Sequence, residues 1–162
     1  MSFICNYGTY GCGKSSDIIK IYHNYKKKGM EALCFRMTND KTQKTISNKL
    51  GISCPAMPIP INTNFNFRKH IELKNLISPV DIVLIDDAHL LNEYEVKKLR
   101  EVSDKGIATV CFGLRSDYKG KLYEGFINMA TYCDRIEEIR GMCWCNKRAI
   151  MSVWKAYQKA EK

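Results

Sequence analysis

The chain has 162 residues, 45% of them hydrophobic, and its 26 Lys and Arg residues outnumber its 17 Asp and Glu residues to give a formal net charge of +9. A chain of this length builds one hydrophobic core, so the composition predicts a single soluble domain and excludes a large multidomain enzyme. No run approaches the roughly 20 apolar residues that span a membrane, and the first residues lack the features of a signal peptide. We therefore expect a cytoplasmic protein without a membrane partner.

Strand and helix patterns alternate along the chain. Apolar runs predict four buried strands and a more polar run predicts an edge strand, in chain order over residues 3–7, 31–37, 81–86, 107–114 and 133–140. Apolar residues at helical spacing predict helices over 16–28 and 93–105. Prolines and asparagines predict a long loop over 54–68. The alternation predicts an α/β fold, a mainly parallel sheet flanked by helices.

The cysteines and lysines are both scattered along the chain. Several of the eight cysteines stand within apolar runs, which is typical of reduced core thiols, and only Cys143 and Cys145 stand apart. The lysines form short clusters, which are typical of solvated helix faces and turns. The positive charge favours anionic ligands in general, but it does not distinguish a nucleotide from a nucleic acid.

A glycine-rich motif follows the first predicted strand. It matches G-x-x-x-x-G-K-[ST] in full and leads into the first predicted helix, as a phosphate-binding P-loop does. Backbone N–H groups and the helix N-terminus would hold the phosphates, Lys14 would reach the β- and γ-phosphate oxygens, and the Ser15 hydroxyl would bind Mg²⁺. A glycine-rich turn that precedes Lys-Ser by chance is the alternative. The predicted ATP-binding residues are Gly8, Thr9, Tyr10, Gly11, Cys12, Gly13, Lys14 and Ser15.

Two consecutive acids follow the most apolar run. Asp86 ends this predicted strand, where a P-loop protein needs an acid for Mg²⁺, and Asp87 follows at once. Because ligands bind at the carboxyl ends of parallel strands, both side chains would face the nucleotide. We therefore predict Asp86 as a Mg²⁺-binding residue, and an ordinary helix cap or loop charge is the alternative for such a pair.

These motifs, in this order, resemble the thymidine kinase family of the bacterial, poxviral and vertebrate cytosolic type. Besides the P-loop, residues 85–91 (Ile-Asp-Asp-Ala-His-Leu-Leu) resemble the family's Ile-Asp-Glu-Ala-Gln-Phe-Phe. Residues 113–120 (Gly-Leu-Arg-Ser-Asp-Tyr-Lys-Gly) are similar to its Gly-Leu-x-x-Asp-Phe-x-Gly. Residues 142–145 (Met-Cys-Trp-Cys) resemble the first half of its zinc site. The resemblance runs over almost the whole chain and implies a P-loop NTPase-like core.

The resemblance also implies an activity. In this family the 5′-hydroxyl of a deoxynucleoside attacks the γ-phosphate of ATP with Mg²⁺ present, and Asp87 stands where the family has a Glu as the catalytic base. Tyr10 and Tyr118 fall near the substrate by the same resemblance. Asp withdraws the carboxylate by about 1.5 Å relative to Glu, and a misplacement on the order of 1 Å can cost about 10²-fold in rate. An impaired or inactive kinase is therefore part of the prediction.

The C-terminal residues depart from the family. The resemblance implies a kinase-like domain over 1–142, after which the family continues into a zinc-held lasso over the base. Cys143 and Cys145 supply two of the four ligands of a structural zinc, a residual half-site, so we do not expect zinc. In place of the lasso, Ile150, Val153, Trp154 and Tyr157 stand at i, i+3, i+4 and i+7 and predict an amphipathic helix in residues 147–161. This helix would pack on its own core or on another chain.

Three functions remain open from the sequence. The first is an ATP–Mg²⁺-dependent deoxynucleoside kinase. Because members of the family form oligomers, the resemblance implies a homo-oligomer. The second is a degenerate nucleotide-binding scaffold that acts through a protein partner, for which the predicted C-terminal helix is a candidate surface. The third, a nucleic-acid-binding ATPase, rests on the net charge alone, and we do not expect it.

Overall fold

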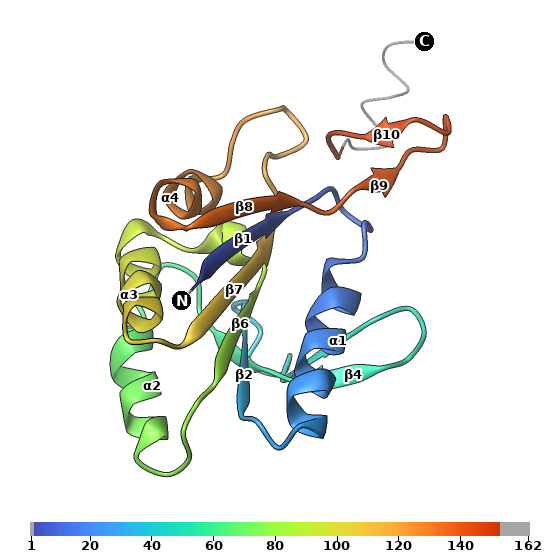
Figure 1. Ribbon diagram of the computed structural model, residues 1–162. Coiled ribbons are helices and arrows are strands. Elements are labelled where there is room, and N and C mark those ends of the chain that lie inside the picture. Colours follow the sequence, from blue (N-terminus) through green and yellow to red (C-terminus); the bar gives the residue numbers. More distant parts are fainter. Residues whose placement is uncertain (1, 153–162) are drawn as a thin grey trace.

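A computed structural model describes residues 2–152 and places a six-stranded parallel sheet at the centre of the molecule (Figure 1). The strand order is β5-β2-β6-β7-β1-β8, and every neighbouring pair is parallel. The strands are β1 Phe3–Tyr7, β2 Ala32–Met37, β5 Met57–Ile59, β6 Ile82–Asp86, β7 Ala108–Gly113 and β8 Arg135–Glu138. The predicted parallel α/β fold is confirmed, and so is the polar edge strand, which is β8.

Helices cover both faces of the sheet, as Figure 1 shows. On one face α1 (Lys14–Lys27) packs over an apolar cluster that includes Leu84 and Phe112. On the other face a larger cluster lies beneath three helices, α2 (Phe67–Asn75), α3 (Glu93–Asp104) and α4 (Glu124–Tyr132). The central strands are buried on both sides, which explains why their sequences are continuously apolar.

Residues 54–68 contain more regular structure than the predicted loop. Ser53–Pro55 is strand β4 of a short antiparallel hairpin with β3 (Thr45–Ser47), Met57–Ile59 is β5, and α2 begins at Phe67. The loop prediction is therefore wrong for these residues. Proline lacks a backbone N–H, but β5 is an edge strand that pairs only with β2, and such a position tolerates Pro58.

The structure also differs from the helix predicted for residues 147–161, in the part of that segment that it describes. Gly141–Met142 (β9) and Arg148–Ala149 (β10) form an antiparallel hairpin, whose turn contains Asn146 in the left-handed conformation at φ 60°. The helix prediction is wrong over residues 147–152, because cross-strand pairing sets the backbone there and the helical period rests mostly on later residues. Val153, Trp154 and Tyr157 lie outside the described residues.

Cys5, Cys34, Cys54 and Cys111 are buried free thiols, as the apolar runs around most of them predict. Within residues 2–152, none of the helices combines the length and the apolar character that crossing a membrane would take.

Candidate nucleotide and phosphoryl-transfer site

The motif at Gly8 to Ser15 forms the turn between β1 and α1. Gly11 and Gly13 have φ angles of 76° and 99°, a region that favours glycine. Gly8 is required for a different reason, because a Cβ atom there would lie 2.4 Å from the Cys12 Sγ atom and 2.6 Å from the Ile139 carbonyl oxygen. Gly13 caps α1 without a side-chain hydrogen bond. The N–H groups of the first helical turn are thus left for an anion.

The Lys14 side chain folds back over this turn. Its ammonium donates to the carbonyl oxygens of Gly8 at 3.2 Å and Thr9 at 2.7 Å, and it lies 3.5 Å from the Cys12 Sγ atom. Ser15 is half-buried in the first turn of α1. The turn therefore holds one positive charge at the point where a bound phosphate would place its negative charge.

Asp86 lies at the carboxyl end of β6 and is only 4% exposed. Burial, followed by the nearby charge of Asp87, raises the pKa of Asp86 to about 6. The Asp87 N–H, which donates to Asp86 Oδ1 at 2.9 Å, and the charges of Arg36 and Lys14 oppose this shift of the pKa. A buried carboxylate with its pKa raised in this way is stabilised by a cation, and carboxylate and hydroxyl oxygens are ligands that suit Mg²⁺. Asp86 and Ser15 therefore fit the predicted metal.

Asp87 follows in the left-handed conformation, with φ 54° and ψ 36°. A non-glycine residue in this region costs of order 1 kcal/mol or more and persists where its surroundings fix it. The Asp87 Oδ2 atom lies 3.5 Å from the Nε atom of Arg36, which comes from the neighbouring strand β2. The site thus contains two acids and two bases, Asp86, Asp87, Lys14 and Arg36, and sequence reasoning missed Arg36.

His89 is buried close to this site, in the short helix that follows Asp87. It is 8% exposed in the short helix η1 (Ala88–Leu90), and its Nδ1 atom accepts the Leu114 N–H at 3.2 Å. Burial lowers the pKa of His89 to about 4, so the ring is neutral near pH 7, with its proton on Nε2. The hydrogen bond ties the residues after Asp87 to the end of β7.

The two tyrosines predicted near the substrate lie at the surface. Tyr10, in the P-loop, is 86% exposed, and its N–H donates to Ser152 Oγ at 3.0 Å. Tyr118 is 39% exposed in the turn after β7, where Asp117 Oδ1 accepts the N–H groups of Lys119 and Lys121. Both belong to loops that follow the carboxyl ends of parallel strands, the edge that also carries Asp86 and Asp87.

The predicted zinc half-site falls in the C-terminal hairpin. The Cys143 N–H donates to the Lys147 carbonyl oxygen at 2.8 Å, and Cys145 is exposed. Hydrogen bonds from Cys145 lower the pKa of the Cys143 thiol. Within residues 2–152, no three His, Cys, Asp or Glu side chains are grouped so that they could together hold a metal ion.

A parallel sheet with a phosphate-binding turn after β1 and an acid at the end of β6 defines a P-loop nucleotide-binding protein. Comparison with known proteins narrows this class, because a sequence model of the family "Thymidine kinase" matches residues 1–162. The chain belongs to the thymidine kinase family.

Individual relatives agree with this assignment. A thymidine kinase of Lactiplantibacillus plantarum is 32% identical over 152 residues, which cover 91% of this chain and 77% of the relative. One of Zymomonas mobilis is 30% identical over 150 residues, with the same two shares. One of Agrobacterium fabrum is 30% identical over 149 residues, or 90% of this chain and 76% of the relative.

Proposed function

We propose that this protein is a deoxynucleoside kinase that transfers the γ-phosphate of ATP to the 5′-hydroxyl of a nucleoside, with thymidine as the first candidate. The observation that carries the proposal is the convergence of Lys14, Asp86 and Asp87 at one edge of the sheet in a member of this family. A phosphate-binding turn alone would support nucleotide binding. The carboxylate of Asp87, which follows the Mg²⁺-binding candidate Asp86, adds a group that can accept a proton.

We assign ATP binding to the P-loop and the N-terminus of α1. The free N–H groups of the helix would donate to phosphate oxygens, and the Lys14 ammonium would exchange the carbonyls of Gly8 and Thr9 for the β- and γ-phosphate oxygens. Ser15 and Asp86 would hold Mg²⁺, which when bound neutralises charge on the β- and γ-phosphates. Tyr10 would then stand at the exposed tip of the turn, on the substrate side.

Asp87 is proposed as the base. The nucleoside 5′-oxygen attacks the γ-phosphorus, the bond from that phosphorus to the bridging oxygen of ADP breaks, and the hydroxyl proton passes to the Asp87 carboxylate. The loop that contains Tyr118 would border the nucleoside. Residues 143–162, with Cys143 and Cys145, are proposed as a C-terminal segment separate from the kinase-like domain over 1–142, and assembly into a homo-oligomer is proposed on the family's example.

The proposal is tested by turnover with ATP, Mg²⁺ and a panel of deoxynucleosides, comparing the unaltered protein with Asp87→Asn. We expect a nucleoside 5′-monophosphate from the unaltered protein and a loss of about 10²-fold or more in Asp87→Asn. Arg68→Met, which changes a half-buried residue on the surface of α2, is the matched control and keeps the rate. ATP binding without phosphorylation of any nucleoside would contradict the kinase and favour the nucleotide-binding scaffold.

A further inference from the structure

Arg36 belongs to the same edge of the sheet as the proposed base, although no motif marks it. It is the register partner of Asp86 in the β2–β6 pair. Its neighbours Phe35 and Met37 point into the apolar cluster beneath α2 and α3, whereas Cys34 points toward α1. Because side chains alternate along a strand, Arg36 points to the α1 face, where the P-loop lies.

The Arg36 guanidinium has contacts on two sides. Its Nε atom lies 3.5 Å from Asp87 Oδ2, and its Nη1 atom donates to the Thr45 carbonyl oxygen of β3 at 3.4 Å. The side chains of Arg36 and Asp87 are 30% and 34% exposed. The Nε atom is buried and makes no hydrogen bond within residues 2–152. The buried Nε–H group of the positively charged Arg36 guanidinium is thus held beside the Asp87 carboxylate.

A neighbouring cation can fix the position of the Asp87 carboxylate. The Asp87 backbone is fixed by the left-handed conformation and by the N–H that donates to Asp86 Oδ1. Its carboxylate, in contrast, lies next to a second carboxylate on the preceding residue, and like charges at this range repel. The ion pair that the structure gives this carboxylate is the one with Arg36. Without it, the Asp87 side chain would rotate away from Asp86 toward solvent.

We propose that Arg36 is a positioning residue, which holds the Asp87 carboxylate in place to accept the proton of the substrate hydroxyl. This inference rests on the proposed function. Its physical basis is that a base displaced by about 1 Å can lose about 10²-fold in rate. The short Asp side chain makes the position of the carboxylate depend on its neighbour. Arg36 acts through Asp87, and its contribution therefore requires the Asp87 carboxylate.

The first test compares Arg36→Met and Arg36→Lys in steady-state turnover of ATP and thymidine. We expect Arg36→Met to lower kcat by about tenfold or more while KM for ATP changes by less than about twofold. Arg36→Lys keeps the charge and restores part of kcat. Arg68→Met is the matched control, because Arg68 also forms ion pairs but on the surface of α2 and α3. An unchanged kcat in a folded Arg36→Met protein would overturn the inference.

The second test is a double-mutant cycle with Asp87→Asn. If Arg36 acts through the Asp87 carboxylate, Arg36→Met costs less than about twofold in the Asp87→Asn background. An equal loss in both backgrounds would overturn the inference, since Arg36 would then act on another group. Melting temperatures of all four proteins separate this coupling from unfolding. An unaltered protein that phosphorylates no nucleoside would contradict the proposed function itself, whereas an active protein indifferent to Arg36 contradicts this inference alone.

Discussion

Asp86 and His89 are buried on either side of Asp87, and their pKa values shift in opposite directions. Relative to the ordinary values of 3.8 and 6.5, the pKa of Asp86 rises to about 6 and that of His89 falls to about 4. Between these limits the native protein holds a protonated Asp86 and a neutral His89, while the unfolded chain holds the charged forms. The charges of Lys14, Arg36 and Asp87 act on this pair and are included in these shifts.

This arrangement predicts opposing pH dependences of stability. Because native His89 binds its proton less readily than the unfolded chain, it lowers the free energy of unfolding as pH falls through this window. Asp86 binds its proton more readily when native and has the opposite effect, so the two contributions oppose each other in the unaltered protein. On acidification from pH 6 to 4, Asp86→Asn should lose stability relative to the unaltered protein, by roughly 1 kcal/mol per pH unit, measured by urea unfolding. His89→Gln should gain stability over the same window, and parallel curves for all three proteins would contradict the assignment.

At the scale of elements, α4 meets η1 backbone to backbone at Gly125. A Cβ atom there would lie 2.5 Å from the His89 carbonyl oxygen and 2.7 Å from that of Ala88. Helix propensity alone predicts that Gly125→Ala stabilises by roughly 0.5–1 kcal/mol. The contact predicts the opposite, a loss of about 1–3 kcal/mol, because backbone must move. Thermal unfolding decides between them, with Thr131→Ala on the exposed face of α4 as the control. A stabilised Gly125→Ala protein would show that this contact is loose.

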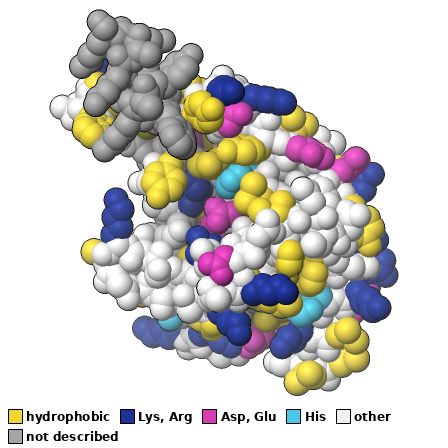
Figure 2. Space-filling model, turned by 180° about the vertical axis from the view of Figure 1, so that it is seen from behind, with side chains coloured by type: hydrophobic (Ala, Val, Ile, Leu, Met, Phe, Trp, Pro, Cys, Tyr) yellow, Lys and Arg dark blue, Asp and Glu magenta, His cyan; other side chains and the backbone are white. Residues whose placement is uncertain are grey.

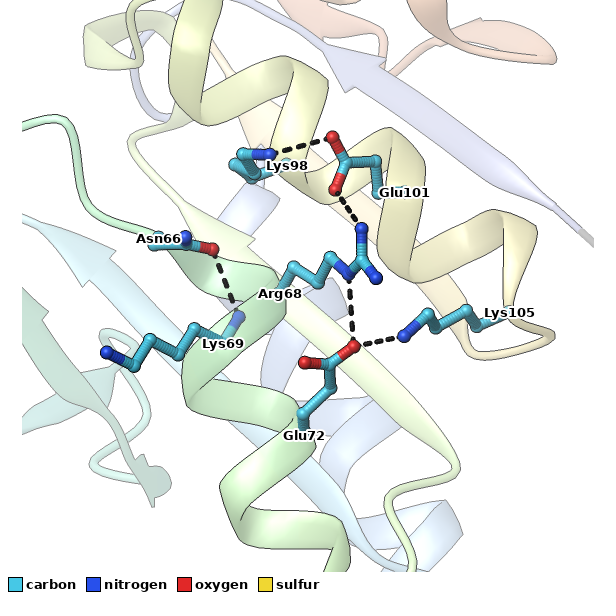
Figure 3. Close-up of polar contacts among 7 residues, drawn as sticks. All are labelled: Asn66, Arg68, Lys69, Glu72, Lys98, Glu101 and Lys105. Carbon is cyan, nitrogen blue, oxygen red and sulfur yellow. Dashed lines mark hydrogen bonds and ion pairs between the residues drawn. The ribbon is translucent and has the colours of Figure 1, made fainter.

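The elements α2 and α3 are joined by two kinds of charge. Figure 3 shows the exposed kind, in which Glu72 pairs with Arg68 and Lys105, and Glu101 pairs with Arg68 and Lys98. The second kind is the fully buried Glu95 in the first turn of α3. It accepts the N–H of Asn92 at 3.0 Å and the N–H of Phe65 at 3.1 Å. Its carboxylate thus holds the chain segment before α2 against α3.

These two kinds of charge should differ in their contribution to stability. Glu95→Gln turns one buried acceptor oxygen into an amide nitrogen that faces an N–H donor, and we expect it to cost about 1–3 kcal/mol. Glu72→Gln breaks exposed ion pairs and should cost less than Glu95→Gln, with a loss that shrinks as salt is added. Chemical denaturation at low and high salt measures both. Equal costs in the two variants would be inconsistent with this difference in burial.

At the scale of the whole molecule, the parallel strands other than β5 and helix α1 could be predicted, because local signals and the final structure agree there. The apolar run before Asp86 and the glycines before Lys14 are such signals. Strand β5 could not be predicted, because whether Pro58 is tolerated depends on its place at the sheet edge, which only the assembled sheet defines. Helix α4 was missed because its nine residues include Gly125, which tertiary contact rather than propensity accounts for.

The residues of the site also differ in whether the sequence predicts them. Lys14 and Asp86 lie in recognisable sequence contexts, and the structure brings them within electrostatic range of each other. Arg36 follows an ordinary apolar run, and only the register of β2 with β6 places it beside the two acids. The net charge of +9 is less informative. On the face drawn in Figure 2, Lys and Arg side chains are spread among other types and form no continuous patch of the kind that follows a nucleic acid backbone.

We propose that one site, which includes Lys14 and Asp87, both binds ATP and transfers its γ-phosphate to a nucleoside. This proposal is tested most directly by counting ADP and thymidine 5′-monophosphate formed over time from ATP, Mg²⁺ and thymidine. We predict equal amounts of the two products from the unaltered protein, and a rate at least about 10²-fold lower in Lys14→Ala, which lacks the ammonium proposed to bind the transferring phosphate. ADP formed without a nucleoside monophosphate, or an undiminished rate in Lys14→Ala, would contradict the claim.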